Sequence, residues 1–174
     1  MNKQRVKWNL AALAIVLVLI QVIQPKKTNP PVISSRALTA HVDVPEPVQA
    51  IMKRACYDCH SNETVWPWYS HVAPVSWMVV DDVNTGRSHV NLQDWEAQEN
   101  ESEAKEHLGL MCKEVREKAM PLFSYRLMHR DSRLSPEEVN TVCTWSQKFA
   151  SAEPDSDEKS HEHHHDHPHD HDDH

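Results

Sequence analysis

The chain is poor in glycine and in basic charge. Its 174 residues include 2 glycines against 11 prolines, and 18 lysines and arginines against 26 aspartates and glutamates. Tight β-hairpin turns usually need glycine, so this scarcity argues against a sheet-rich fold. A net charge of −8 argues against nucleic-acid binding, which usually needs a basic surface. We therefore expect an all-α chain without a nucleic-acid partner.

One long apolar run is present, from Trp8 to Ile23, and basic residues precede it. Basic residues on this flank are typical of a membrane helix whose N-terminus stays in the cytoplasm. No A-x-A-like cleavage site follows, so residues 1–24 are interpreted as an uncleaved signal anchor rather than a cleaved signal peptide. Either segment would export the rest of the chain, and the uncleaved anchor would hold it at the inner membrane, facing the periplasm.

Residues 25–43 are rich in proline, serine and threonine and predict an extended linker. Residues 44–150 carry helical patterns and are expected to fold. The first helix should begin near Pro45 and bury one apolar face. A short helix is expected over residues 75–83, ended by Gly86, and a longer one over residues 99–118. A capping box at Ser135 predicts a last helix that packs against the first.

Two of the four cysteines stand in the pentapeptide Cys56-Tyr57-Asp58-Cys59-His60. C-x-x-C-H is the attachment sequence of c-type haem. Two thiols at this spacing can reach the two vinyl groups on one edge of a porphyrin, and the imidazole that follows can bind the iron. Half a zinc site would want a second short Cys/His pair, and a thioredoxin-like pair would want a strand–helix–strand pattern; neither is seen. We predict one covalent haem c on Cys56 and Cys59, with His60 as the proximal ligand.

The other two cysteines, Cys112 and Cys143, lie on the apolar faces of predicted helices. They can form a disulfide if the domain is extracytoplasmic. They can equally be small buried hydrophobic residues. The sequence leaves both alternatives open.

A six-coordinate haem needs a ligand opposite the histidine. Met120 follows a predicted helix and precedes Pro121, and its thioether would give a higher reduction potential than a second imidazole. His129 is the main rival, because it would make a bis-histidine haem. The remaining candidates are Met78, Met111, Met128 and His71.

Tryptophan and proline dominate the segment after the motif, residues 61–78, and predict loops with short helical turns. We expect four rings of this segment to pack around the porphyrin, with ordinary core packing as the alternative for each. They are Trp66, Trp68, Tyr69 and Trp77.

The C-terminal segment, residues 151–174, is polar and acidic, so we expect it to be disordered. Histidine-rich tracts bind Zn²⁺, Ni²⁺ or Cu²⁺. The candidate ligands are His161, His163, His164, His165, His167, His169, His171 and His174. The alternative is a solvated tail without a metal role.

Residues 56–64, 66–70 and 73–77 resemble the bacterial haem-binding domain family of small cytochrome c-like proteins. So do Gly86-Arg87, Met120-Pro121, Ser124-Tyr125, His129, and Leu134 to Glu138 with Trp145. The resemblance covers residues 44–150, with the anchor and tail outside it. It implies a cytochrome c-like helical domain with one covalent haem c, and a distal-ligand loop at Met120. Family members often carry a glycine before that loop, where this chain has Lys118-Ala119.

These patterns predict a membrane-anchored monohaem cytochrome c that exchanges single electrons with unidentified redox proteins and is not an enzyme. A second hypothesis is a haem-based sensor or peroxidase-like protein with a displaceable sixth ligand. A third is a metal-handling protein that uses the histidine-rich tail.

Overall fold

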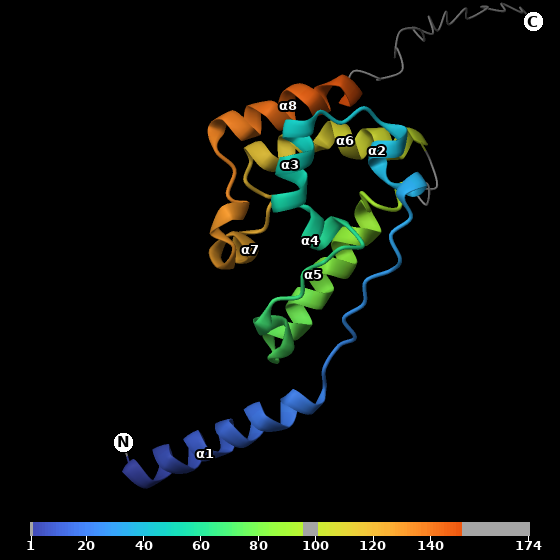
Figure 1. Ribbon diagram of the computed structural model, residues 1–174. Coiled ribbons are helices and arrows are strands. Elements are labelled where there is room, and N and C mark those ends of the chain that lie inside the picture. The colour runs from blue at the N-terminus through green and yellow to red at the C-terminus, as the bar shows by residue number, and fades with distance from the viewer. Residues whose placement is uncertain (1, 96–100, 151–174) are drawn as a thin grey trace, which may run out of the picture.

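The computed structural model describes residues 2–95 and 101–150 (Figure 1). Within these residues every regular element is a helix, which confirms the all-α fold. The α-helices are α1 (Lys3–Leu19), α2 (Leu38–His41), α3 (Glu46–Ala55), α4 (Tyr57–His60), α5 (Val75–His89), α6 (Glu101–Arg116), α7 (Phe123–Met128) and α8 (Pro136–Ala150). Short 3₁₀ helices are η1 (Ile20–Val22), η2 (Ser34–Arg36), η3 (Trp68–His71) and η5 (Arg130–Ser132).

Helix α1 projects away from the rest of the described chain, and only the C-terminal end of the helical stretch approaches the domain (Figure 1). Together α1 and η1 form a helical stretch of 20 residues, Lys3–Val22, and none of its apolar window is buried. An α-helix needs about 20 apolar residues to cross a bilayer, so this stretch is long and apolar enough to do so.

The predicted linker, residues 25–43, follows the surface of the domain instead of standing free. The Arg87 guanidinium donates to the carbonyl oxygen of Thr28 at 2.7 Å and to Asn29 Oδ1 at 3.0 Å. Further along, Leu38 is 2% exposed, and its N–H donates to the carbonyl oxygen of Leu92 at 2.9 Å. Proline and serine content predicts extension but not these partners, because they lie far away in the sequence.

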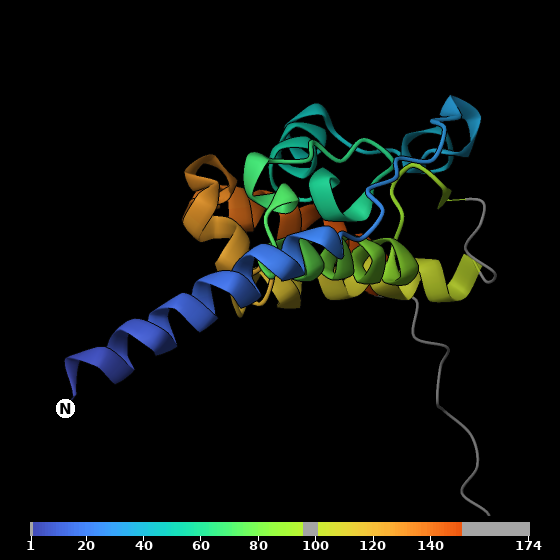
Figure 2. The same ribbon diagram turned by 90° about the horizontal axis from the view of Figure 1, so that it is seen from below.

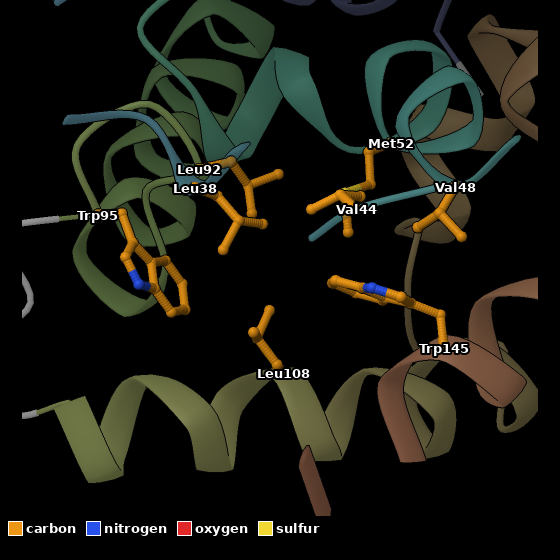
Figure 3. Packing of buried hydrophobic residues seen from close by; sticks show 8 residues of the cluster. All are labelled: Leu38, Val44, Val48, Met52, Leu92, Trp95, Leu108 and Trp145. Carbon is orange, nitrogen blue, oxygen red and sulfur yellow. The ribbon is translucent and has the colours of Figure 1, made fainter. Parts of the chain in front are cut away.

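The main hydrophobic core is built around Trp145 of α8 (Figure 3). The Trp145 indole N–H donates to the carbonyl oxygen of Asp43 at 3.0 Å, which satisfies its polar group inside the core. Because Val48 and Met52 of α3 belong to the same cluster, α8 packs against α3 as predicted. The cluster comprises Leu38, Val44, Val48, Met52, Leu92, Trp95, Leu108 and Trp145.

A second core cluster lies between α6, α8 and α3, and it contains a disulfide between Cys112 and Cys143. The sequence leaves open whether these two cysteines form a disulfide or are small buried hydrophobic residues, and the structure has the disulfide. The bridge closes a loop over a sequence separation of 31 and stabilises the fold mainly by restricting the unfolded chain.

The start of α8 is the predicted capping box. Glu138 N–H donates to Ser135 Oγ at 3.2 Å, and Ser135 N–H donates to Glu138 Oε2 at 2.8 Å. The other Glu138 oxygen accepts from Arg54 of α3, so the cap also ties α8 to the end of α3.

Gly86 does not end a helix, contrary to the prediction; it lies inside α5, which continues to His89. A Cβ atom on Gly86 would lie 2.6 Å from the Cys59 carbonyl oxygen and 3.2 Å from Cys59 Cβ. The absence of a side chain therefore lets α4 lie directly against α5. A close helix–helix contact, and not helix termination, accounts for this glycine.

We expect Gly86→Ala to destabilise the protein by about 2 kcal/mol. The added methyl group would press against the Cys59 backbone, and overpacking of this kind costs up to about 3 kcal/mol. Alanine is a better helix former than glycine, which offsets about 1 kcal/mol of that cost. Thermal unfolding of the detergent-solubilised protein measures this loss. The control is Thr85→Ala at the exposed neighbouring position, which should change stability by less than about 0.5 kcal/mol. Equal stability of the two variants would contradict the close contact.

Candidate haem site

One helical turn carries all three motif side chains. The N–H groups of Cys59 and His60 both donate to the carbonyl oxygen of Cys56, at 3.1 and 2.9 Å. Positions i, i+3 and i+4 of a helix lie on the same face. Cys56, Cys59 and His60 are therefore neighbours on one side of the turn formed by α4.

The His60 ring is oriented by the end of α5. Its Nδ1 lies 3.1 Å from the carbonyl oxygen of Val90. A carbonyl only accepts, so Nδ1 carries the proton and Nε2 keeps a lone pair. Burial lowers the pKa of His60 and favours the neutral ring, which is the form that binds metals. A histidine that donates through one nitrogen to a carbonyl and binds metal through the other is a common arrangement in metalloproteins.

Cys56 and Cys59 are both half-buried free thiols. Burial raises the pKa of each to about 12. Both side chains are therefore protonated thiols near neutral pH, next to a neutral imidazole. This trio can bind a porphyrin edge covalently and its iron axially.

Polar side chains behind the motif hold it against α5. Arg87 donates to the carbonyl oxygen of Ser61 and to Thr64 Oγ1, both at 2.7 Å. Leu92 N–H donates to the His60 carbonyl oxygen at 2.8 Å. Because the same Arg87 also bonds the 25–43 segment, one side chain joins the motif, α5 and the chain leaving the N-terminal helix.

The middle of the motif reaches α7 through Asp58. Its Oδ2 accepts from the Tyr125 hydroxyl at 2.6 Å, and its Oδ1 accepts from Val65 N–H at 3.0 Å. Tyr125 stacks on His129 with 4.3 Å between ring centroids, and His129 Nε2 lies 2.7 Å from the Tyr69 hydroxyl. Burial and the Asp58 carboxylate raise the pKa of Tyr125. The pattern C-x-x-C-H leaves its two middle positions unspecified, so it gave no signal for Asp58 or for its partner Tyr125.

Comparison with protein families shows which cofactor the domain binds. A model of the haem-binding domain family matches residues 15–148. The chain belongs to this family. The match begins inside α1, so the family region is wider than the predicted range of 44–150 and includes part of the apolar helix. No curated protein and no solved structure matches the chain.

The family assigns haem as the cofactor, and the residues of α4 fit it. Two free thiols and a histidine with an available Nε2 lie on one turn. Among residues 2–95 and 101–150, no group of three or more His, Cys, Asp or Glu side chains is arranged to hold a metal ion by itself. The eight predicted metal-binding histidines of the tail lie outside the described residues.

The candidates for the sixth iron ligand occupy different environments. Met120 is 37% exposed in the loop after α6, and its N–H donates to the Glu114 carbonyl oxygen at 3.1 Å. His129 has its Nε2 engaged by Tyr69. The other candidates are Met78 and Met128, both exposed; Met111, packed against both core clusters; and His71, exposed on η3.

The four predicted pocket rings occupy different environments. Tyr69 belongs to the network with His129, and Trp66 is half-buried. Trp68 is 74% exposed, and the Trp77 indole N–H donates to the Ile23 carbonyl oxygen at 2.7 Å, at the end of the N-terminal helix. Contact between these rings and haem stays a prediction.

Lys118, just before the Met120 loop, has φ = 58°, in the left-handed region that favours glycine. Glycine would adopt this conformation without strain at the position before the Met120 loop. We expect Lys118→Gly to raise stability by about 0.5–1 kcal/mol, because it removes a left-handed lysine costing about 1–2 kcal/mol and adds glycine's smaller entropic cost.

Urea unfolding of the solubilised protein measures this effect. The matched control is Lys113→Gly inside α6, where glycine should lower stability by about 1 kcal/mol because it is a poor helix former. A loss of stability in both variants would contradict the left-handed conformation at Lys118.

Proposed function

We propose that the protein is a membrane-anchored monohaem c-type cytochrome that transfers single electrons on the periplasmic side of the inner membrane. One observation carries the proposal: His60 donates through Nδ1 to Val90, beside two free thiols on the same turn. This leaves Nε2 for iron and both sulfurs for thioether bonds.

In this chain Cys56, Cys59 and His60 would hold the haem. The S–H bond of each thiol would add across one vinyl group, so that a C–S bond forms and the hydrogen goes to the neighbouring carbon, with no oxidant required. His60 would bind the iron through Nε2. When bound, haem contributes a reversible one-electron Fe(III)/Fe(II) couple.

Export of the domain is supported by two independent features. The helical stretch Lys3–Val22 has the length and apolar composition of a membrane span. The disulfide between Cys112 and Cys143 is typical of proteins in oxidising compartments and uncommon in the bacterial cytosol. Both features suit a haem domain outside the cytoplasmic membrane.

Met120 is the preferred sixth ligand. His129, its main rival, already shares its Nε2 with the Tyr69 hydroxyl and stacks on Tyr125. Binding iron through this nitrogen would break that hydrogen bond, whereas Met120 has a neutral thioether in a partly exposed loop. A six-coordinate haem favours electron transfer over ligand activation, so we propose a carrier and not a catalyst.

The attachment proposal is tested by a pyridine haemochrome spectrum of protein made in a host with haem c maturation. The native chain should keep its haem after denaturation. Cys59→Ser should shift the spectrum to that of a haem with one thioether, and Cys56→Ser/Cys59→Ser should lose the haem on denaturation. The control, Cys112→Ala/Cys143→Ala, should retain a normal haemochrome if it folds. Release of haem from the native chain under denaturing conditions would overturn covalent attachment.

The sixth-ligand proposal is tested by comparing Met120→Ala with His129→Ala. Met120→Ala should lose the thioether-to-iron charge-transfer absorption and lower the reduction potential, because water or a nitrogen ligand replaces sulfur. His129→Ala should keep both properties close to those of the native protein. The reverse result would favour bis-histidine ligation. Rapid carbon monoxide binding to the native ferrous protein would favour the sensor or peroxidase-like alternative.

A further inference from the structure

Exposed apolar side chains gather where the end of the N-terminal helix meets the start of α5. Val22 is 84% exposed on one side of this junction, and Met78 is 60% exposed on the other. We call this set the tip patch: Val22, Ile23, Val72, Val75, Trp77 and Met78.

Hydrogen bonds fasten the two sides of the tip patch together. The Gln21 side chain donates to the Ala73 carbonyl oxygen at 3.0 Å and accepts from Ala73 N–H at 2.9 Å. The Trp77 indole N–H donates to the Ile23 carbonyl oxygen at 2.7 Å. The polar groups at this junction therefore hydrogen-bond to one another. An apolar environment requires this, because it offers no water as an alternative partner. In Figure 1 the start of α5 is the part of the helical domain that lies nearest to the C-terminal end of the N-terminal helix, and Figure 2 shows the two overlapping when the molecule is seen from below.

This step rests on the proposed role of α1 as the membrane anchor. If α1 crosses the bilayer, the hydrogen bonds at this junction determine how deep the start of α5 lies in it. Gln21 and Val22 lie at the exit end of the span, so Ala73, bonded to Gln21, lies at nearly the same depth. Trp77 suits this level, since tryptophan is enriched at membrane–water interfaces. The exposed carboxylate of Asp81, one turn beyond Met78, sets the limit of the contact because a charge stays in water.

We propose that the tip patch is a second membrane contact of the haem domain: it lies in the lipid interface of the same bilayer that α1 crosses. The first turn of α5 then rests in the interface. Gly86, the contact point of α4, lies about 12 Å further along α5 than Met78, at 1.5 Å per residue. The haem site is thereby held at a short, fixed height above the lipid.

Thiol labelling of the full-length protein in phosphatidylcholine nanodiscs tests this contact without any protein partner. A charged, membrane-impermeant maleimide is the probe. In the haem-loaded chain the motif sulfurs are thioethers and Cys112–Cys143 is a disulfide, so an introduced cysteine is the reactive one. The test position is Met78→Cys, the aqueous control on the same helix is Thr85→Cys, and the membrane control in α1 is Val16→Cys. Labelling in sodium dodecyl sulfate normalises each variant.

We expect Met78→Cys and Val16→Cys to label at least about tenfold more slowly than Thr85→Cys, because a charged reagent does not enter an apolar phase.

A different result would separate the two membrane contacts. If Val16→Cys is protected but Met78→Cys labels as fast as Thr85→Cys, the tip contact is overturned and the anchor stands. The patch would then face a protein partner or water. A reactive Val16→Cys would overturn the anchor and the tip contact together. Labelling of the unmodified chain reports motif thiols without haem, which is a failure of the attachment proposal only.

Discussion

The contact between Gly86 and the carbonyl of Cys59 is the constraint on which the haem end of the molecule depends. It brings the α5 backbone against α4. Because α5 then ends beside the motif, the Val90 carbonyl reaches His60 Nδ1 and the Arg87 guanidinium reaches Ser61 and Thr64. A side chain at position 86 would separate the two helices, and the orientation of His60 would be lost with the contact.

Features set by near neighbours in the chain could be predicted from the sequence. The C-x-x-C-H spacing fixes which side chains share a turn, and the Ser135–Glu138 box fixes the start of α8, because each depends on residues within four positions. Gly86 could not be interpreted in this way. Glycine near a predicted helix end suggests termination, while its real partner, Cys59, lies 27 positions earlier and becomes visible only when the chain folds.

The difference between near and distant neighbours in the sequence also explains the other predictions. Helical spacing placed Cys112 and Cys143 on inward faces but could not say whether the faces meet, so the disulfide stayed undecided until the packing of α6 on α8 was known. Composition predicted an extended 25–43 segment, yet its position along the domain depends on distant donors, chiefly Arg87. The bond from Tyr125 to Asp58 was missed because it spans 67 positions and no pattern requires it.

These distant bonds limit how the domain can turn relative to the N-terminal helix. A flexible proline-rich tether would let the domain turn freely relative to the bilayer. Here Gln21, Lys27 and Arg87 bond the start of the tethering segment, residues 21–29, to the domain at successive points. The C-x-x-C-H motif lies against the C-terminal part of α5 at Gly86, so its orientation relative to the N-terminal helix is fixed as well. If α1 spans the membrane and the domain transfers electrons as proposed, a redox partner would meet one defined face of the domain, and the exchange rate would depend on that face and not on tether length.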